Sequence, residues 1–252
     1  MPAAGDRCFP ETAVMDVTLD TIGANLALDE ALLVEAEERG AAPVLRFWES
    51  AGLAVVLGAS SRIHDDVDVE RCRDAGVEIQ RRSSGGGTVV VGPGALNVAV
   101  VVPASANPAL GAVDSTQSFV LNKLAKILAG LGRPASVQGL GDLTTGDRKF
   151  AGSAQRRLRR NVMVHVSLLY EFPLDLVTRF TRPPKKQPAY RNGRSHADFL
   201  TNFPESRARI VGAITDAWHA LGSGVETRPV PVDILNRLIA TKYADRSWVT
   251  RL

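Results

Sequence analysis

Residues 81–87, RRSSGGG, carry the side chains of this sequence best suited to chemistry. Three consecutive glycines cost backbone entropy that a simple turn could avoid, so something has to come close to that backbone. Successive N–H groups in a glycine run can form an anion-binding nest, and the guanidinium groups of Arg81 and Arg82 can grip a phosphate or carboxylate. Two interpretations stay open: an anion-binding loop, or a flexible hairpin loop flanked by solvated arginines.

Two familiar phosphate-binding devices do not fit this stretch. The chain contains no G-x-x-x-x-G-K-[ST] pattern, which excludes a Walker A loop. A valine-rich, strand-like run follows the glycines, whereas a dinucleotide fingerprint needs a helix there.

A second candidate stretch is GLGDLTTGDRKFAGSAQRR, residues 139–157, with a single lysine, Lys149, just before the small residues AGSA. Small residues let a ligand approach the backbone, and a lysine beside them could neutralise a phosphate or polarise an acyl oxygen. A turn-rich segment with a surface lysine is the alternative.

These stretches together resemble lipoate-protein ligases and their relatives, the lipoyl and octanoyl transferases of the biotin/lipoate protein ligase superfamily. RRSSGGGTVVVGPGALNVAV is similar to their RRxSGGG signature, the segment from Gly141 to their NDL…K-x-x-G-x-A motif, and HVSLLYEFPLDLV to their HGTLL…DL strand. The resemblance runs in the family's order from about residue 20 to residue 180.

The resemblance implies a role for each matching residue. Lys149 would be the catalytic lysine that contacts the acyl carbonyl and a phosphate, and Asp142 would hold Mg²⁺ or orient the nucleotide. The other implied substrate- and nucleotide-binding residues are Arg82, Ser84, Gly85, Gly86, Gly87, Asn97, Gly152, Ser153 and His165.

The reaction implied is ATP-dependent. Lipoate or octanoate would be activated with ATP and Mg²⁺ to an acyl-adenylate, and the acyl group passed to a lysine of a lipoyl carrier domain, because a free carboxylate is a poor acyl donor. A transferase using a preactivated donor is the alternative. Cysteine-dependent acyltransferases of the superfamily carry their nucleophile near the acyl pocket, and no cysteine follows Cys72, which favours the ligase.

The sequence departs from the family pattern at four positions. Val91 and Gly92 stand where many members have His-Asp, Gly141 replaces the Asn of NDL, and Val166 replaces the Gly of HGTLL. These changes leave a third possibility open, a homologue that binds lipoate or its adenylate without turnover.

Two further basic segments could contact ligands or partners. RRLRR, residues 156–160, could be a solvated face or a docking site for an acidic lipoyl domain, and nothing in it favours nucleic acid. The loop KKQPAYRNGRSHADF, residues 185–199, with Arg191, Arg194, His196 and Asp198, could close over the nucleotide or meet the acceptor. His196 could be a general base or a structural histidine.

Hydrophobic periodicity predicts the elements that position these residues. We expect a helix over 25–40 capped by Asn25 and ended by Gly40, a helix over 118–132 with Asp114 or Ser115 as its cap, and helices over 204–222, with Pro204 at its first position, and 232–243. Strands are expected over 44–50 and 53–58, in a hairpin around the GPG of residues 92–94, and over 162–172.

The expected fold is a mixed α+β domain of the class II synthetase or biotin/lipoate ligase type, with a largely antiparallel sheet flanked by helices. We expect residues 1–252 to form a single catalytic domain without a full-length C-terminal accessory domain, so a separate accessory subunit could be needed.

Composition fits this expectation. The 252 residues are 45% hydrophobic and 23% charged, with a net charge of +3, which suits a globular protein with an anionic ligand. Cys8 and Cys72 have no metal-site spacing, and no signal-peptide pattern or long apolar run is present. We therefore expect a cytoplasmic protein that binds neither membrane nor nucleic acid.

Overall fold

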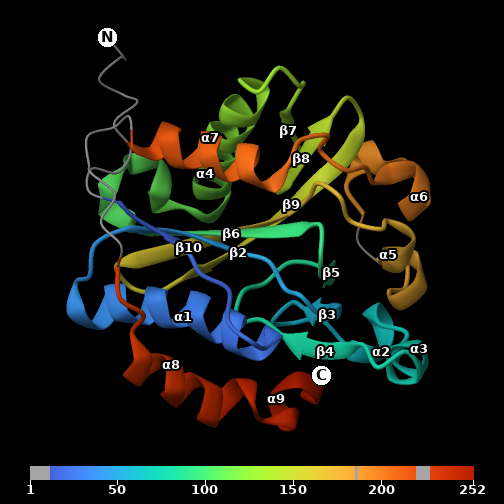
Figure 1. Cartoon of the computed structure of the whole chain (residues 1–252), viewed down its shortest axis with the longest axis horizontal. Coiled ribbons are helices and arrows are strands. Elements are labelled where there is room, and N and C mark those ends of the chain that lie inside the picture. The colour runs from blue at the N-terminus through green and yellow to red at the C-terminus, as the bar shows by residue number, and fades with distance from the viewer. Residues whose placement is uncertain (1–11, 185–186, 220–227) are drawn as a thin grey trace.

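A seven-stranded sheet is the main feature of the computed structural model, which describes residues 12–184, 187–219 and 228–252 (Figure 1). Its strand order is β1-β2-β6-β10-β9-β8-β7. β1 and β2 run parallel, and every other neighbouring pair is antiparallel. The strands are β1 Ala13–Asp16, β2 Val44–Trp48, β6 Ala95–Pro103, β7 Ser136–Gln138, β8 Asp142–Thr145, β9 Arg148–Arg157 and β10 Asn161–Leu169.

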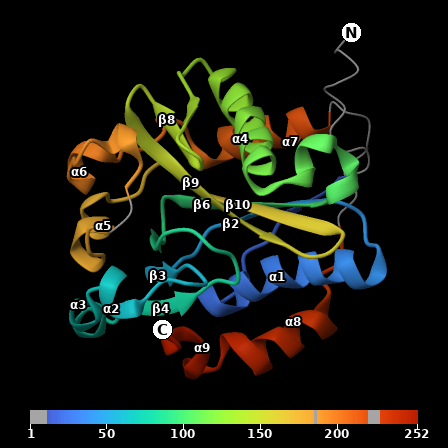
Figure 2. The ribbon, with the colours of Figure 1, turned by 180° about the vertical axis from the view of Figure 1, so that it is seen from behind.

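Helices cover both faces of this sheet (Figures 1 and 2). α4 (Val113–Ala129) and α7 (Arg207–His219) pack on one face, α1 (Ile22–Arg39) packs on the other, and α8 (Val232–Leu238) lies outside α1. Alternate side chains of a strand point to opposite faces, so Val100 of β6 enters the core beneath α4 while Val101 enters the core above α1.

A second sheet of three short strands stands beside the α1 face. β3 (Ala54–Leu57) is its centre, parallel to β4 (Glu78–Arg81) and antiparallel to β5 (Val89–Val91). α2 (Ile63–Asp66), α3 (Val69–Asp74) and α5 (Asp175–Phe180) enclose a separate core with it. The glycine-rich stretch therefore connects two strands of this small sheet.

The remaining elements are short. They are the 3₁₀ turns η2 Ala104–Ala106, η3 Pro108–Gly111 and η4 Ala189–Arg191, the helices α6 His196–Phe199 and α9 Arg246–Thr250, and the π-helical η5 Ile239–Tyr243. The helix expected over 232–243 is present as α8 continued by η5. Residues 220–222 of the expected helix over 204–222 lie outside the described residues.

The predicted starts of three helices are wrong. Thr21 caps α1, because its Oγ1 accepts from Ala24 N at 3.1 Å, and the side chain of Asn25 instead binds Leu19. α4 begins at Val113 after Ala112, so Asp114 and Ser115 lie inside its first turn. α7 begins at Arg207, not Pro204. The predicted stop of α1 at Gly40 is confirmed, with a left-handed φ of 65°.

The predicted hairpin around the GPG of residues 92–94 is also wrong. β5 and β6 flank this stretch but belong to different sheets. Gly94 has a φ of 86°, and a Cβ there would lie 2.4 Å from the carbonyl carbon of Glu171. The sharp turn thus redirects the chain between sheets and presses it against the segment after β10.

The expected fold class is confirmed: a mixed α+β arrangement with a largely antiparallel sheet flanked by helices. Within the described residues, no helical stretch has the length and hydropathy that a membrane span requires.

Candidate functional site

Two adjoining cavities lie between the α1 face of the large sheet and the small sheet. The narrow cavity has a volume of about 160 Å³ and is walled by residues of α1, β2, β3, β5, β6, β9 and β10. The wide cavity, about 1070 Å³, extends from it toward α2, α5 and α6. Asp142, Lys149 and Gly152 line both, so they mark the junction of the two cavities.

A β-bulge turns Lys149 toward this junction. β8 and β9 pair Leu143 with Ala151 and Thr144 with Lys149, which leaves Phe150 as an extra residue in β9. An extra residue reverses the alternation of a strand, so Lys149 shares the cavity face with Gly152 instead of pointing into the core. The stretch 139–157, expected to be turn-rich, is in fact this bulged hairpin, turned at Gly146 with a φ of 58°.

Lys149 is held by one carboxylate. Its Nζ lies 2.6 Å from Asp142 Oδ1, and the Tyr190 hydroxyl donates to Asp142 Oδ2 at 2.7 Å. A Cβ at Gly152 would lie 2.9 Å from the lysine Nζ, so the absence of a side chain at residue 152 leaves room for the ammonium group. Burial and the hydrogen bond to Asp142 raise the pKa of Tyr190, which keeps its phenol a donor.

The glycine loop wraps around one arginine. Arg82 is 6% exposed; its Nε donates to Ser84 Oγ at 3.0 Å, and Nη2 donates to the carbonyls of Gly85 at 2.5 Å and Gly87 at 2.7 Å. Burial lowers the pKa of Arg82 to about 10, so it stays charged at neutral pH. The guanidinium therefore shapes the loop from inside, and its role as a phosphate ligand stays a prediction.

The three glycines are not equivalent. Gly86 has a φ of 82°, and a Cβ on Gly58 would lie 2.1 Å from the Gly86 carbonyl oxygen, so two backbones touch there. A Cβ on Gly85 or Gly87 would meet nothing within 4 Å. The middle glycine is thus needed for the fold of the loop, while the space beside its neighbours is open to a ligand.

Ser84 links the loop to β10. It is fully buried, and its Oγ lies 2.6 Å from His165 Nε2. Burial, and secondarily the Arg82 charge, lower the pKa of His165 to about 3, so the imidazole is neutral. Because Arg82 donates to Ser84 Oγ, the Ser84 hydroxyl proton can be directed at Nε2. We therefore expect the imidazole proton on Nδ1.

This hydrogen-bond chain predicts a histidine that does not titrate near neutrality. Nitrogen NMR of His165 is expected to show the Nδ1–H tautomer and constant ring shifts from about pH 8 to about pH 5. Since the folded-state pKa of about 3 lies below the ordinary 6.5, the unfolded chain binds this proton first. The stability contribution of His165 is therefore lost as the pH falls from about 6.5 to about 3. A titration midpoint near 6.5 would contradict the buried, neutral assignment.

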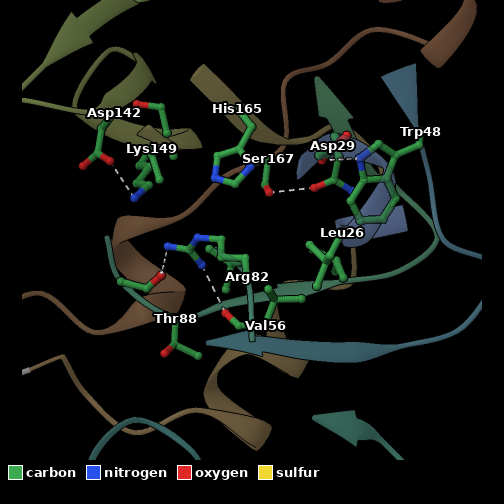
Figure 3. Close-up of a pocket in the computed structure, with 17 residues that line it drawn as sticks. Leu26, Asp29, Trp48, Val56, Arg82, Thr88, Asp142, Lys149, His165 and Ser167 are labelled. Atoms are coloured by element: carbon green, nitrogen blue, oxygen red, sulfur yellow. Dashed lines mark hydrogen bonds and ion pairs between the residues drawn. The ribbon is translucent and has the colours of Figure 1, made fainter. Parts of the chain in front are cut away.

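The far end of the narrow cavity is apolar and closed by an indole (Figure 3). Leu26, Val56 and Trp48 gather there, away from Lys149 and Asp142, with His165 and Ser167 on one side and Arg82 on the other. Asp29 also lines this end of the cavity; it accepts from Trp48 Nε1 at 3.1 Å and is paired with the buried Arg46. A buried network thus fixes the ring that ends the cavity.

Polar residues of the central strands line the middle of the narrow cavity. Asn97 of β6 stands opposite Ser167 of β10, whose hydroxyl donates to Asn97 Oδ1 at 2.7 Å. The Asn97 amide nitrogen donates to the Ala95 carbonyl at 3.3 Å, so both ends of this amide have partners within the protein.

The structure brings most of the predicted site residues together. The two cavities are lined by Arg82, Gly86, Gly87, Asn97, Asp142, Lys149, Gly152, Ser153 and His165. Ser84 lies behind this wall against His165, and Gly85 caps Arg82 from the loop. Sequence patterns missed Leu26, Asp29, Trp48 and Tyr190, because apolar or paired residues in regular elements carry no signal beyond core packing.

The departures from the family pattern have distinct places. Val91 adds to the apolar wall of the narrow cavity, whereas Val166 is buried beneath α4, on the opposite face of the sheet. A Cβ at Gly141 would lie 2.7 Å from Gln117 Nε2, which donates to Ser153 Oγ at 2.7 Å. A glutamine amide from α4 therefore fills the space that a side chain at residue 141 would need.

The two other basic segments differ. Arg191 and His196 line the wide cavity, and burial with the Arg191 and Lys149 charges lowers the pKa of His196 to about 4. In RRLRR, by contrast, Arg156 binds Ser83 O and Glu30, Arg157 binds Leu110 O, and Arg160 binds Glu37. These arginines serve internal contacts.

No preformed metal site is apparent in the described residues. In residues 12–184, 187–219 and 228–252, no group of three or more His, Cys, Asp and Glu side chains could hold a metal. Both carboxylate oxygens of Asp142 are already engaged, by Lys149 and Tyr190. Cys72 is buried in the small core, where burial raises its pKa to about 11, and Cys8 lies outside the described residues.

The sequence of this chain is similar to those of lipoyl and lipoate protein ligases. Residues 21–213 match the family model described as lipoyl protein ligase A/B catalytic domain. A putative lipoate-protein ligase A of Aeropyrum pernix is 31% identical, over 89% of this chain and 86% of that protein. A probable lipoate-protein ligase A of Mycoplasma genitalium is 27% identical over 72% of this chain, which spans only 52% of that protein.

Solved structures share the fold. A bipartite lipoate protein ligase from Thermoplasma acidophilum, described with its E2 lipoyl domain, superimposes with a TM-score of 0.80 at 20% identity, over 96% of both chains. A lipoate-protein ligase A bound with ATP gives a TM-score of 0.80 at 20% identity, over 95% of this chain and 98% of that one. A putative lipoate protein ligase from T. acidophilum with bound lipoic acid gives the same score and identity, over 96% and 100%.

Proposed function

Because this chain belongs to the lipoyl protein ligase A/B catalytic-domain family, we propose that it activates lipoate or octanoate with ATP and transfers the acyl group to a lysine of a lipoyl carrier domain. The observation that carries the proposal is the position of Lys149, which lines both the narrow and the wide cavity. An ammonium at that junction suits a reaction that joins an apolar acid to a nucleotide.

The two cavities divide the substrates by chemistry. The narrow one ends in Leu26, Val56 and Trp48 and suits an alkyl chain or small ring, since a dry cavity of about 150 Å³ accepts a benzene-sized group. The wide one carries Arg62, Arg182 and Arg191 and suits an anionic nucleotide. The acid would therefore enter tail first, with its carboxylate toward Lys149.

In the first step, a carboxylate oxygen of the acid attacks the α-phosphorus of ATP, an acyl–O–phosphorus bond forms, and pyrophosphate leaves. Attack brings two anionic groups together, so it needs positive charge and alignment. Lys149 supplies the charge at the junction, and the open side of Gly85 and Gly87 leaves room for a phosphate beside the loop. The loop N–H groups are suited to hydrogen-bond that phosphate.

In the second step, the neutral amine of the acceptor lysine attacks the acyl carbon, the amide forms, and AMP leaves with the electron pair of the C–O bond. The neutral imidazole of His196 in the wide cavity could accept the proton that the amine loses. Lys149 would stabilise the charge that develops on the acyl oxygen.

Mg²⁺ fits this proposal as part of the nucleotide. It is usually held by one or two carboxylates together with substrate phosphates. Asp142 is the carboxylate at the junction, but its pairing with Lys149 argues against a site formed before the nucleotide binds. Its assignment to Mg²⁺ stays a prediction.

A reaction of the purified chain with Mg-ATP and lipoate or octanoate, without any other protein, tests the proposal. Acid-dependent release of pyrophosphate and an acyl-AMP detected by mass spectrometry are the expected results. Acyl transfer from a carrier-bound donor, without pyrophosphate release, would identify a transferase instead. Binding of the acid and ATP without either product would identify a non-catalytic homologue.

The acceptor and accessory subunit form a separate part of the proposal. We propose that a lipoyl domain presents its lysine at the wide cavity, in line with the lipoyl domain named for the T. acidophilum ligase. Adding a lipoyl domain, with and without a second ligase subunit, to chain already carrying acyl-AMP tests this. Transfer that needs the second subunit would assign that subunit to the second step.

Replacing Tyr190 with phenylalanine is expected to slow acyl-AMP formation about tenfold, with KM values for both substrates unchanged. The variant removes the donor to Asp142 Oδ2, which frees the carboxylate that places Lys149. Tyr170→Phe is the matched control, because that phenol also donates to a carboxylate, Glu49, but outside both cavities. Equal rates for the two variants would show that Tyr190 does not position Lys149.

A further inference from the structure

Residues 242–252, named here the C-terminal segment, reach the wall of the wide cavity. They lie beyond the matched family region, which ends at residue 213. Figures 1 and 2 both show the C-terminus beside β4, the strand that leads into the glycine loop. Two buried side chains, Arg81 and Glu30, join this segment to the site.

Arg81 is the first of these links and is fully buried. Its Nε and Nη2 donate to the Val249 carbonyl at 3.0 and 2.8 Å, and its Nη1 donates to the carbonyls of Gly58 at 2.9 Å and Ser61 at 2.6 Å. One guanidinium therefore ties the end of α9 to the loop after β3. In return, Trp248 Nε1 donates to the Arg81 carbonyl at 2.8 Å.

The loop held in this way forms part of the wide cavity. Ser60, Ser61 and Arg62 line that cavity but not the narrow one. The chain after it is also tied down, because Ile63 N donates to the Leu252 carbonyl at 3.2 Å. Gly58, at the start of the loop, touches the backbone of Gly86.

Glu30 of α1 is the second link and is 3% exposed. It accepts from Lys242 Nζ at 2.8 Å and from the Tyr243 hydroxyl at 2.7 Å. The same carboxylate lies 3.3 Å from Arg156, whose Nη1 donates to the Ser83 carbonyl at 3.1 Å. Residues 242 and 243 are thus connected through one buried charge to the first serine of the glycine loop.

Trp248 joins the two links. Two cations lie close to its ring, with Lys242 Nζ 4.2 Å and the Arg251 guanidinium 3.9 Å from the ring centre. Loss of the indole would therefore loosen α9, the Lys242 contact and the hydrogen bond to Arg81 together.

We infer that the C-terminal segment is a clamp that positions the nucleotide half of the site, with Trp248 as its main positioning residue. This inference rests on the proposed function only for the identity of the ligand, MgATP. Tyr243 packs in the core that also contains Leu26 and Trp48, whereas Trp248 acts through Arg81, which holds the loop at residues 58 and 61. Loss of Trp248 is therefore expected to affect the nucleotide half of the site and not the acid half.

Calorimetric binding of MgATP and of lipoate to wild-type chain and Trp248→Ala tests the clamp. We expect the dissociation constant for MgATP to rise about tenfold in the variant and that for lipoate to stay within twofold. Arg246→Ala, an exposed change on the same helix, is the matched control and is expected to change neither. Equal weakening of both ligands, or of neither, would overturn the inference.

Hydrogen exchange separates this outcome from failure of the proposed function. Trp248→Ala is expected to speed amide exchange in residues 58–63 and 81–84 while leaving β8 and β9 unchanged. Unchanged exchange in those residues would overturn the clamp whatever the ligand. A wild-type chain that binds no MgATP would instead overturn the proposed function, before any variant is compared.

A second variant keeps the test valid if Trp248→Ala does not fold. Trp248→Phe retains an aromatic ring near Lys242 and Arg251 but removes the N–H that binds the Arg81 carbonyl, together with part of the fused ring. We expect about a threefold loss of MgATP affinity without loss of lipoate affinity. Wild-type affinity for MgATP in this variant, with unchanged exchange at 58–63, would count against the clamp.

Discussion

Replacement of Lys149 by alanine is expected to slow acyl-AMP formation about 100- to 1,000-fold, the loss typical of removing one preorganised charge from a reacting centre. The side chain is 27% exposed and lies at the junction of two cavities, outside the hydrophobic cores. The thermal midpoint should therefore change little, and lipoate should still bind. Single-turnover formation of acyl-AMP measures the effect.

Two controls identify the cause of that loss. Lys126→Ala removes an exposed lysine of α4 and should leave the rate unchanged. Lys149→Ala also leaves the Asp142 carboxylate without its cation, which by itself would repel phosphates. If Asp142→Asn added to Lys149→Ala restored the rate, charge balance and not contact with the reacting atoms would be the role of Lys149.

Arg82→Lys is expected to lower both stability and activity while keeping the charge. A single ammonium cannot replace a planar group that binds Ser84 Oγ and the carbonyls of Gly85 and Gly87 together. Loss of two or three buried hydrogen bonds corresponds to about 3 kcal/mol of unfolding free energy. Acyl-AMP formation should fall about 100-fold, because the loop that borders both cavities loses its internal support.

Urea unfolding and the single-turnover assay measure these two losses. Arg160→Lys is the matched control, because the Arg160 side chain is largely exposed and forms an ion pair with Glu37. This substitution should change the unfolding free energy by less than about 0.5 kcal/mol. An Arg82→Lys chain with wild-type stability would show that the guanidinium does not hold the glycine loop.

Local sequence patterns predicted which segments form strands better than they predicted which strands pair with one another. The valine runs around the GPG of residues 92–94 are strands, but the turn carries the chain from the small sheet to the large one. Turn chemistry fixes a change of direction and not the strand that will be paired, which depends on contacts distant in sequence. Gly94 illustrates this, because the backbone of Glu171 occupies the space that a Cβ at residue 94 would need.

The orientation of Lys149 could not be predicted from alternation. Strict alternation along β9 would put Lys149 and Gly152 on opposite faces, and only the extra residue at Phe150 brings them to the same cavity. A bulge of this kind has no pattern in one sequence. The ordered motifs of the family resemblance placed Lys149 among the site residues without predicting how it gets there.

The hydrogen-bond partners of the two arginines could not be predicted from the sequence either. The two arginines that open RRSSGGG looked alike as anion ligands, yet Arg82 supports the loop and Arg81 holds the C-terminal segment. Their partners are backbone carbonyls, which any residue provides. Only the folded structure distinguishes a guanidinium that is hydrogen-bonded to backbone carbonyls of its own chain from one that is available to a ligand.

The acyl-adenylate is the central claim, and oxygen labelling tests it most directly. Octanoate carrying ¹⁸O in both carboxylate positions would be incubated with the chain, Mg-ATP and a lipoyl domain, with a second ligase subunit added if transfer requires it. The AMP released after transfer would then be analysed by mass spectrometry. AMP carrying one ¹⁸O is the predicted result, because a carboxylate oxygen bonds to the α-phosphorus in the first step and stays there when the amide forms. Octanoylated lipoyl domain accompanied by unlabelled AMP, or by label in another phosphate product, would contradict the account.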